Sequence, residues 1–162
     1  MNRLVSFVVV LGCFSNGCGG LQQSSNDSEV LGSNSAAVFI PPLSSYRVSS
    51  PFGQRSSGFH SGVDLAAPHS TAVKNIGNGV KQSSGTEGAC GLVVRMSHSV
   101  SGKSWVSRYC HMSSFAGVNG RYYSQGTVIG RVGSTGRSSG PHLHLELYRN
   151  GVLQNPSGWI RL

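Results

Sequence analysis

The sequence predicts an all-β domain, and three observations carry this prediction. Glycine is abundant, at 23 of 162 residues, while charged residues make up only 11% of the chain. Short apolar runs alternate with Ser- and Gly-rich stretches, which is typical of many short strands joined by turns. The segment 140–148 alternates polar and apolar residues without a break, as a half-buried strand does. The length suits one domain with a single core, plus extensions.

The N-terminal residues 1–12 have the pattern of a secretion signal. One basic residue precedes an apolar run that is too short to span a bilayer but suits the hydrophobic region of a signal. The next residues, Val10-Leu11-Gly12-Cys13, resemble the lipobox of bacterial lipoproteins, so we expect Cys13 to become the lipidated first residue of the mature chain. The alternative is an ordinary signal cleaved near Gly17 or Gly20. Either reading predicts export from the cytoplasm, and the first predicts a lipid anchor in the cell envelope.

Residues 13–43 are expected to form a flexible tether, and residues 44–162 the folded domain. Most of the tether consists of Ser, Asn, Gly and Gln, with too little apolar surface to bury. Its last residues, 36–43, are more apolar and are expected to pack against the edge of the domain. The tether would give the domain reach at the envelope surface.

The net charge of +8 comes from Lys and Arg residues that are spread singly along the chain. Such a surface favours anionic partners, which outside the cytoplasm are cell-wall polymers and phospholipid head groups. Nucleic acid is not an expected partner, because the sequence has no recognition helix and no aromatic-basic motif. A nucleotide site is also rejected: the glycine spacing of residues 133–140 lacks the required Lys, and a strand rather than a helix follows it.

Two segments hold residues that suit a metal site. Within 59–68, His60 and Asp64 would lie about 13 Å apart in a straight strand, but Gly62 between them permits a bend. In the strand 140–148, the leucines would face the core, while His142, His144, Glu146 and Tyr148 would face a cleft or solvent. Each segment alone is more often an ordinary surface strand that carries polar residues.

Taken together, His60, Asp64 and His144 change this balance. Two imidazoles and one carboxylate are a usual ligand set for catalytic Zn²⁺, which keeps a fourth position for water. Bound zinc lowers the pKa of that water to about 7 and so makes it a nucleophile at neutral pH. The combination therefore predicts metal-assisted hydrolysis.

Three separated motifs resemble those of lysostaphin-type (LytM-domain) zinc metalloendopeptidases. The similarity runs from about Tyr46 to Leu162, and it includes Phe52-Gly53-x-Arg55 and the closing Asn155-Pro156. The resemblance implies a mostly antiparallel β-sheet sandwich with a groove over one sheet, and peptide cross-links of peptidoglycan as substrate. The motifs are, in order, His60-x-Gly62-x-Asp64, Tyr109-Cys110-His111-Met112, and the run from Gly133 to Glu146 that contains His142-Leu143-His144.

The same resemblance implies the role of each site residue. His60, Asp64 and His144 would bind zinc, with His111 and His142 as the catalytic pair. Peptide hydrolysis needs a base for the water proton and a donor for the oxyanion and the leaving amine, and histidine suits both roles near neutral pH. The sequence leaves open which histidine takes which role. It also leaves open whether Glu146 orients an imidazole or is a solvated strand residue.

Three further features of the domain follow from the residues around these motifs. Tyr109 and His111 are expected to form a second alternating pair on one strand. Some lysostaphin-like members place a Tyr in the loop before the first ligand, whereas residues 55–59 contain none, so that oxyanion donor is unassigned and the groove is expected to be more open there. His98, at a strand end, is interpreted as structural.

Cys90 and Cys110 are expected to form a disulfide. Residues 91–97 and 104–110 read as two strands, and a hairpin centred near Val100 would place the two cysteines directly opposite each other. The oxidising compartment implied by the signal favours the bond. The alternative is two buried free thiols.

The sequence as a whole predicts an envelope-anchored zinc endopeptidase that cuts peptide cross-links of peptidoglycan. The alternative is a non-enzymatic LytM-like regulator of a cell-wall amidase. Such regulators generally lack several ligands, whereas this chain has all three and both catalytic histidines. A secreted toxin against other bacteria would share the chemistry, and the lipobox argues against it.

Overall fold

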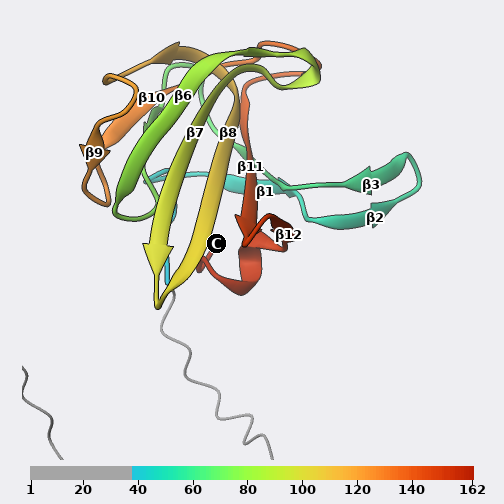
Figure 1. Ribbon diagram of the computed structural model, residues 1–162. Helices are drawn as coiled ribbons and strands as arrows, with labels where there is room; N and C mark the ends of the chain where they lie inside the picture. The colour runs from blue at the N-terminus through green and yellow to red at the C-terminus, as the bar shows by residue number, and fades with distance from the viewer. Residues whose placement is uncertain (1–37) are drawn as a thin grey trace, which may run out of the picture. The chain divides into compact units, whose positions relative to one another are not determined.

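The computed structural model describes residues 38–162, and within this range the chain is almost entirely β-structure (Figure 1). Two short 3₁₀ turns, Gly88–Cys90 and Pro156–Gly158, are the only helical elements of the described range. This confirms the predicted all-β class. The signal, the lipidation site at Cys13 and residues 13–37 of the expected tether lie outside the described residues. None of the described helical segments has the length and hydropathy of a membrane span.

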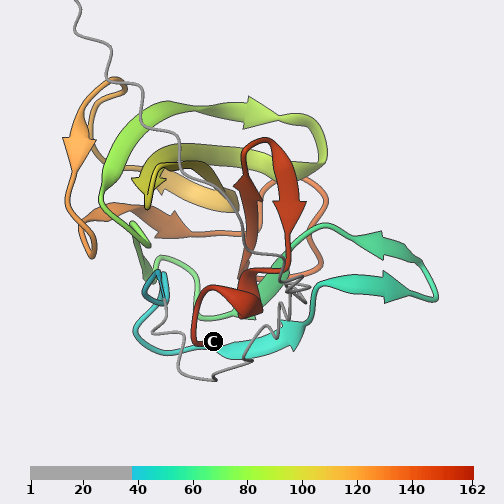
Figure 2. The ribbon, with the colours of Figure 1, turned by 60° about the horizontal axis from the view of Figure 1, so that its bottom comes forward.

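Every strand pair is antiparallel, and most strands belong to one sheet. The sheet order is β1-β4-β11-β8-β7-β6-β9, with β12 beside β11 and with β10 pairing both β5 and β8. The strands β2 and β3 form a separate hairpin that projects from the body of the domain (Figures 1 and 2). The strands are β1 Arg47–Ser50, β2 Gly53–Arg55, β3 Gly58–His60, β4 Val63–Ala66, β5 Ala72–Lys74, β6 Gly79–Glu87, β7 Gly91–Val100, β8 Lys103–Phe115, β9 Tyr122–Tyr123, β10 Val128–Val132, β11 His142–Arg149 and β12 Val152–Gln154.

Strand β11 is an interior strand of this sheet, between β4 and β8. Its leucines at 143, 145 and 147 are 0% exposed and belong to the hydrophobic core, as the alternating pattern predicts. Burying a leucine side chain contributes about 1.5–3 kcal/mol, so these three residues fix which face of the strand points inward. The opposite face, which carries the histidines, is therefore directed to the groove.

The folded domain begins earlier than the predicted boundary at residue 44. Phe39 and Leu43 are each 2% exposed and lie in the core. Phe39 also forms a bridge with Ile160, and the backbone amide of Ile40 donates to the carbonyl of Ile76. Residues 38–43 are therefore part of the domain and not of a tether.

The β7–β8 hairpin differs from the expected one in its register. Its turn is the two-residue pair Ser101-Gly102, with positive φ angles of 49° and 69°, and Val100 pairs with Lys103. Two successive left-handed residues are the signature of a type I′ turn, whose twist matches that of antiparallel strands. The hairpin is thus not centred near Val100, and the ladder does not place Cys90 opposite Cys110.

A β-bulge interrupts the same hairpin near the groove. Leu92 pairs with Met112 and Val94 with Tyr109, so that Cys110 and His111 together oppose a single residue of β7. His111 has a φ of 62°, which a non-glycine residue adopts at a cost of order 1 kcal/mol. Bulges re-aim side chains, and this one turns His111 out of the strict alternation of its strand.

Candidate active site

Neighbouring strands bring Asp64 and His144 together. In the β4–β11 ladder these two residues are direct cross-strand partners, so their side chains rise side by side from one face. His60 ends β3, and the chain turns back through Gly62 before β4 begins. A Cβ on Gly62 would overlap the carbonyl oxygen of Leu145 and lie 2.7 Å from Cε1 of His144. Glycine is thus needed here because the backbone passes so close to His144.

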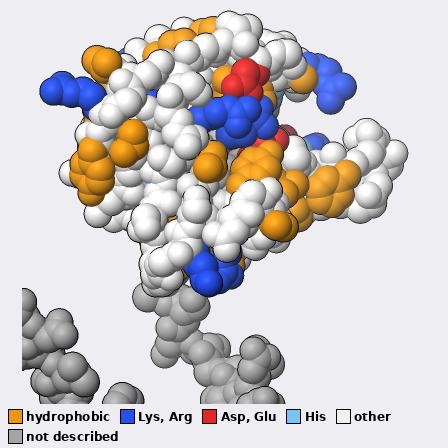
Figure 3. Space-filling view, in the orientation of Figure 1, with side chains coloured by type: hydrophobic (Ala, Val, Ile, Leu, Met, Phe, Trp, Pro, Cys, Tyr) orange, Lys and Arg blue, Asp and Glu red, His pale blue; other side chains and the backbone are white. Residues whose placement is uncertain are grey.

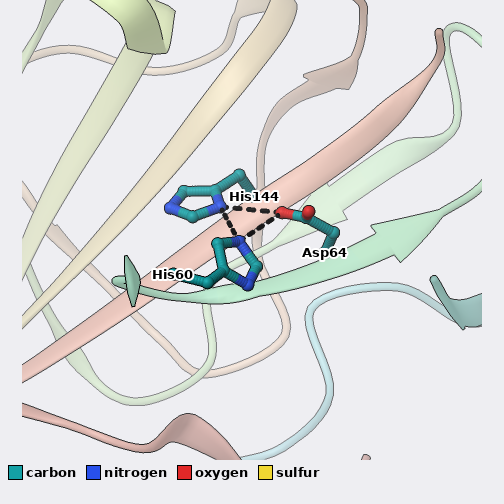
Figure 4. Close-up of side chains that lie close together, drawn as sticks. All are labelled: His60, Asp64 and His144. Atoms are coloured by element: carbon teal, nitrogen blue, oxygen red, sulfur yellow. Dashed lines mark hydrogen bonds and ion pairs between the residues drawn. The ribbon is translucent and has the colours of Figure 1, made fainter. Parts of the chain in front are cut away.

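The three predicted ligands converge on one point (Figure 4). Oδ1 of Asp64 lies 2.7 Å from Nδ1 of His144 and 3.1 Å from Nε2 of His60, and the two ring nitrogens are 3.0 Å apart. Two of the three side chains are buried, and Asp64 is partly buried. Among the described residues, this is the group of His, Cys, Asp and Glu side chains whose donor atoms are close enough together to hold a metal ion.

The outer hydrogen bonds of the two imidazoles determine which nitrogen faces this point with a lone pair. Nδ1 of His60 lies 2.7 Å from the carbonyl oxygen of Pro51, which can only accept, so the His60 proton is on Nδ1. Nε2 of His144 faces a carboxylate oxygen of Glu146 at 3.4 Å, so its proton is on Nε2. Both remaining nitrogens then present lone pairs to the carboxylate of Asp64. Two ring nitrogens with lone pairs and one carboxylate oxygen, with no proton between them, form a site that fits a metal cation.

The electrostatics of this cluster also favour a cation. Burial would raise the pKa of Asp64, but the hydrogen bond to His144 and the charges of the nearby imidazoles outweigh it and lower that pKa. Burial would likewise lower the pKa of His144, but its hydrogen bonds to Asp64 and Glu146 outweigh it and raise that pKa. The cluster therefore stabilises positive charge, which a proton or a metal ion can supply.

His111 and His142 lie beside this cluster with their rings 4.6 Å apart. Nδ1 of His111 donates to the carbonyl of Thr135 at 2.8 Å, and Nδ1 of His142 donates to the carbonyl of Gly140 at 2.8 Å. Each ring therefore keeps a free Nε2, and that of His142 is 3.8 Å from Oδ1 of Asp64. Burial lowers the pKa of His111, so its imidazole is neutral near pH 7.

The expected pairing of Tyr109 with His111 on one face is wrong. Tyr109 is 0% exposed and lies in the core, where its hydroxyl accepts from the backbone amide of Ile76 at 3.1 Å. The bulge at Cys110 and His111 separates the two side chains, because an inserted residue reverses the alternation. His98 is likewise buried away from the groove and contacts the carbonyl of Asn78 and the hydroxyl of Ser107, in keeping with a structural role.

Glu146 is a buried, fully engaged carboxylate and not a solvated strand residue. It is 5% exposed and accepts hydrogen bonds from Ser61 at 2.6 Å and from Tyr148 at 2.8 Å. Arg108, its cross-strand partner on β8, forms an ion pair with it. Burial would raise the pKa of Glu146, but the hydrogen bonds and the charge of Arg108 lower it to about 2. Glu146 is therefore ionised at neutral pH.

Several residues near the site were not predicted. Arg108 also bonds Glu87 at 2.8 Å, and Glu87 in turn bonds Arg95 at 2.7 Å, which links the β6–β7 hairpin to Glu146. The only sequence signal for the Arg108–Glu146 pair is their opposite charge, and it becomes visible once the β8–β11 register is known. The carbonyls of Pro51, Thr135 and Gly140, which orient three imidazoles, carry no residue-type signal at all.

The three predicted ligands, the pair His111 and His142, and Glu146 all line a groove of about 550 Å³. Its walls come from the β2–β3 hairpin, the 3₁₀ turn Gly88–Cys90 and the loop between β10 and β11. Cys90 and Cys110 form a disulfide with a Cα–Cα distance of 4.8 Å. Because Cys90 sits in the 3₁₀ turn before β7, the bond joins that turn to the bulge of β8. It therefore anchors the backbone on which His111 is carried.

Known proteins share both this sequence pattern and this fold. The family model described as peptidase family M23 matches residues 58–156, which is more than half of the chain. The DD-carboxypeptidase/endopeptidase Mpg of Neisseria meningitidis is 42% identical over 123 residues, which cover 72% of this chain. That match spans only 28% of the length of the Neisseria protein.

Two solved structures have the same fold. The catalytic domain of the antimicrobial peptidase lysostaphin from Staphylococcus simulans aligns with a TM-score of 0.64 at 29% identity, over 70% of this chain and 90% of that one. A zinc-containing peptidase from Vibrio cholerae aligns with a TM-score of 0.67 at 25% identity, over 74% of this chain and 39% of that one. With the family match over residues 58–156, they establish that this chain belongs to peptidase family M23, the lysostaphin- and LytM-type family.

Proposed function

We propose that this protein is a zinc metalloendopeptidase that hydrolyses peptide cross-links of bacterial peptidoglycan. The observation that carries the proposal is the convergence of Nε2 of His60, Oδ1 of Asp64 and Nδ1 of His144, each within 3.1 Å of the other two. A zinc ion held by these atoms would supply a water of lowered pKa and an electrophile for the scissile carbonyl.

His111 and His142 are assigned the proton transfers. Their rings are 4.6 Å apart at one side of the ligand cluster, so both can reach the same reacting carbonyl. His111 is neutral because burial lowers its pKa, and it is proposed to accept the proton of the attacking water at Nε2. To act as the donor, His142 must carry a proton on Nε2 as well as on Nδ1; it is then proposed to hydrogen-bond the oxyanion and to pass the Nε2 proton to the leaving amine. The proton taken up by His111 is released to solvent, from which His142 regains its own. The carbonyls of Thr135 and Gly140 hold both rings in the required orientation.

Peptidoglycan is proposed as the substrate because of the groove and the relatives. The groove is lined mostly by polar side chains, which can hydrogen-bond the backbone of a peptide. The Neisseria relative carries DD-carboxypeptidase/endopeptidase activity in its name, and lysostaphin is described as an antimicrobial peptidase. This substrate requires an extracytoplasmic location, and we propose that Cys13 is lipidated there. A Cys13→Ser protein that still incorporates radiolabelled palmitate would contradict the anchor.

The function is tested with purified muropeptide dimers, product masses and bound zinc measured on the same preparations. His60→Ala, Asp64→Ala and His144→Ala are expected to lose zinc and cleavage together. His111→Ala and His142→Ala are expected to retain zinc and to lose cleavage. Unchanged cleavage by His142→Ala would contradict its role, and full activity in the presence of a strong chelator would contradict the metal mechanism.

The same experiment separates the enzyme from a regulator of a cell-wall amidase. A regulator would leave muropeptide dimers intact with zinc bound, and it would raise the activity of an added amidase. The complete ligand set and both histidines favour the enzyme, because a protein that only binds has no need of two oriented imidazoles beside a metal site.

A further inference from the structure

Two arginines line the groove without taking part in the chemistry described above. Arg55 ends β2 on the projecting hairpin, and Arg137 lies in the loop between β10 and β11. Within residues 38–162, the bonds recorded for either residue involve only its backbone: the Arg55 carbonyl accepts from Gln54, and the Arg137 amide donates to Ala89. Their guanidinium groups have no hydrogen bond or ion pair with the described part of the chain.

No acidic side chain of residues 38–162 forms an ion pair with them. The acidic residues of 38–162 are Asp64, Glu87 and Glu146. Asp64 is held by the histidines, Glu87 by Arg95 and Arg108, and Glu146 by Arg108. Figure 3 shows the resulting imbalance on one face, where red is confined to the centre beside blue while further blue groups stand apart from any red. The two groove arginines therefore have free charge to offer a ligand.

Both arginines are placed on elements that also hold the reacting groups. In the β2–β3 ladder, Arg55 pairs with Gly58 and Gly53 pairs with His60, so the hairpin that carries Arg55 ends at a ligand of the cluster. Arg137 precedes Ser138, whose hydroxyl lies 3.3 Å from Nδ1 of His142. An anion bound by either guanidinium would thus lie in the same groove as the reacting groups.

We propose that Arg55 and Arg137 form a carboxylate-binding subsite that selects cross-linked stem peptides with free carboxylates over neutral ones. A guanidinium presents paired N–H donors that match both oxygens of a carboxylate, and charge-assisted bonds of this kind are about twice as strong as neutral ones. The proposal rests on the proposed function, because it names the substrate class that the same groove accepts. It predicts that glycine-only bridges are poor substrates.

The test compares two ligands that differ only in charge. One is a synthetic cross-linked stem-peptide dimer with free carboxylates, and the other is the same dimer with those carboxylates converted to primary amides. Binding of each is measured by calorimetry to the zinc-loaded His142→Ala protein, in which neither ligand should be cleaved. The free dimer is expected to bind about tenfold more tightly, and Arg55→Gln or Arg137→Gln in that background should reduce the preference to threefold or less.

Arg121→Gln is the matched control, because Arg121 is exposed and does not line the groove. It removes the same charge and should leave the preference intact. Three results would overturn the subsite. The parent protein could prefer the free dimer by less than threefold, or the preference could survive both groove substitutions. Arg121→Gln could also lose as much of the preference as the groove variants do. Cleavage by the wild-type protein is scored separately: if it cuts neither dimer, the proposed function fails while the binding preference still decides the subsite.

Discussion

Replacing Glu146 by Gln should weaken zinc binding at the proposed site without disturbing its three proposed ligands. Glu146 is ionised, because its hydrogen bonds and the charge of Arg108 lower its pKa to about 2, and one of its oxygens lies 3.4 Å from Nε2 of His144. A carboxylate in this position fixes the tautomer of the imidazole and makes its other nitrogen a better electron donor. Glutamine keeps the shape of the side chain and removes the charge, so the substitution isolates the electrostatic contribution.

The expected magnitude lies at the lower end of the usual range. Loss of the group that hydrogen-bonds the second ring nitrogen of a zinc-bound histidine typically costs 10- to 100-fold in metal affinity, or about 1.4–2.8 kcal/mol. Here the bond to His144 is long at 3.4 Å, and Arg108 already offsets part of the carboxylate charge. We therefore expect an increase of about tenfold in the dissociation constant of zinc.

Replacing Arg108, the other member of this ion pair, should have the opposite effect on zinc affinity. Arg108→Met removes the cation and leaves Glu146 with its full negative charge facing the site. Zinc affinity should then be unchanged or higher, while the fold loses about 3–5 kcal/mol because a largely buried pair has been broken. Generalised damage to the site would instead weaken zinc binding in both variants, so the sign of the change distinguishes the two explanations.

The assay is equilibrium competition for zinc against a chromophoric chelator at pH 7.5, with unfolding midpoints measured on the same proteins. Tyr148→Phe is the control, because it removes another hydrogen bond to Glu146, of 2.8 Å, and retains the charge. A zinc dissociation constant for Glu146→Gln within twofold of the wild-type value would refute the proposed influence of Glu146 on His144. A loss of affinity in Arg108→Met equal to that in Glu146→Gln would refute its electrostatic origin.

Three further substitutions test other parts of the structure. Gly62→Ala should abolish zinc binding, because its Cβ would lie 2.7 Å from Cε1 of His144; metal analysis that finds a full equivalent of zinc would contradict this. Glu87→Gln should lower stability at neutral pH by about 1 kcal/mol or less. The hydrogen bond to Arg95 depresses the pKa of Glu87 below 4.5, so this stabilisation is present above pH 4.5 and is lost as the pH falls through the folded-state pKa. Urea titrations should show the wild-type and variant curves converging in acid. Replacing Cys90 and Cys110 by Ser should cost about 2–4 kcal/mol, since the bond closes a loop with a sequence separation of 20, and an unchanged urea midpoint would disprove the contribution.

The sequence was most informative where one side-chain pattern had one structural solution. The unbroken alternation of β11 determined both its buried leucines and its histidine face, and the structure has both as expected. The grouping of His60, Asp64 and His144 was also predictable, because two imidazoles and one carboxylate are a usual ligand set for catalytic zinc. The His144–Asp64 contact itself depends on the β4–β11 register, which no local pattern specifies.

The sequence was least informative where backbone geometry overrides alternation. Tyr109 and His111 are two residues apart, and only the bulge sends one into the core and the other into the groove. The β7–β8 turn lies at Ser101-Gly102, just beyond the predicted centre at Val100, and the positive φ angles of these two residues set the register. The predicted Cys90–Cys110 disulfide is present, but Cys90 is brought to Cys110 by the 3₁₀ turn Gly88–Cys90 and not by direct pairing in the β7–β8 ladder.

The bulge and the disulfide act on the same few atoms, and this explains why His111 can hold an unfavourable backbone conformation. A φ of 62° at a non-glycine residue would normally relax toward the extended region. Here the preceding residue, Cys110, is covalently tied to Cys90, and Nδ1 of His111 is held by the carbonyl of Thr135 at 2.8 Å. Constraints on both the backbone and the ring leave Nε2 directed into the groove, so the strain is offset by contacts that also orient the imidazole for its proposed proton transfer.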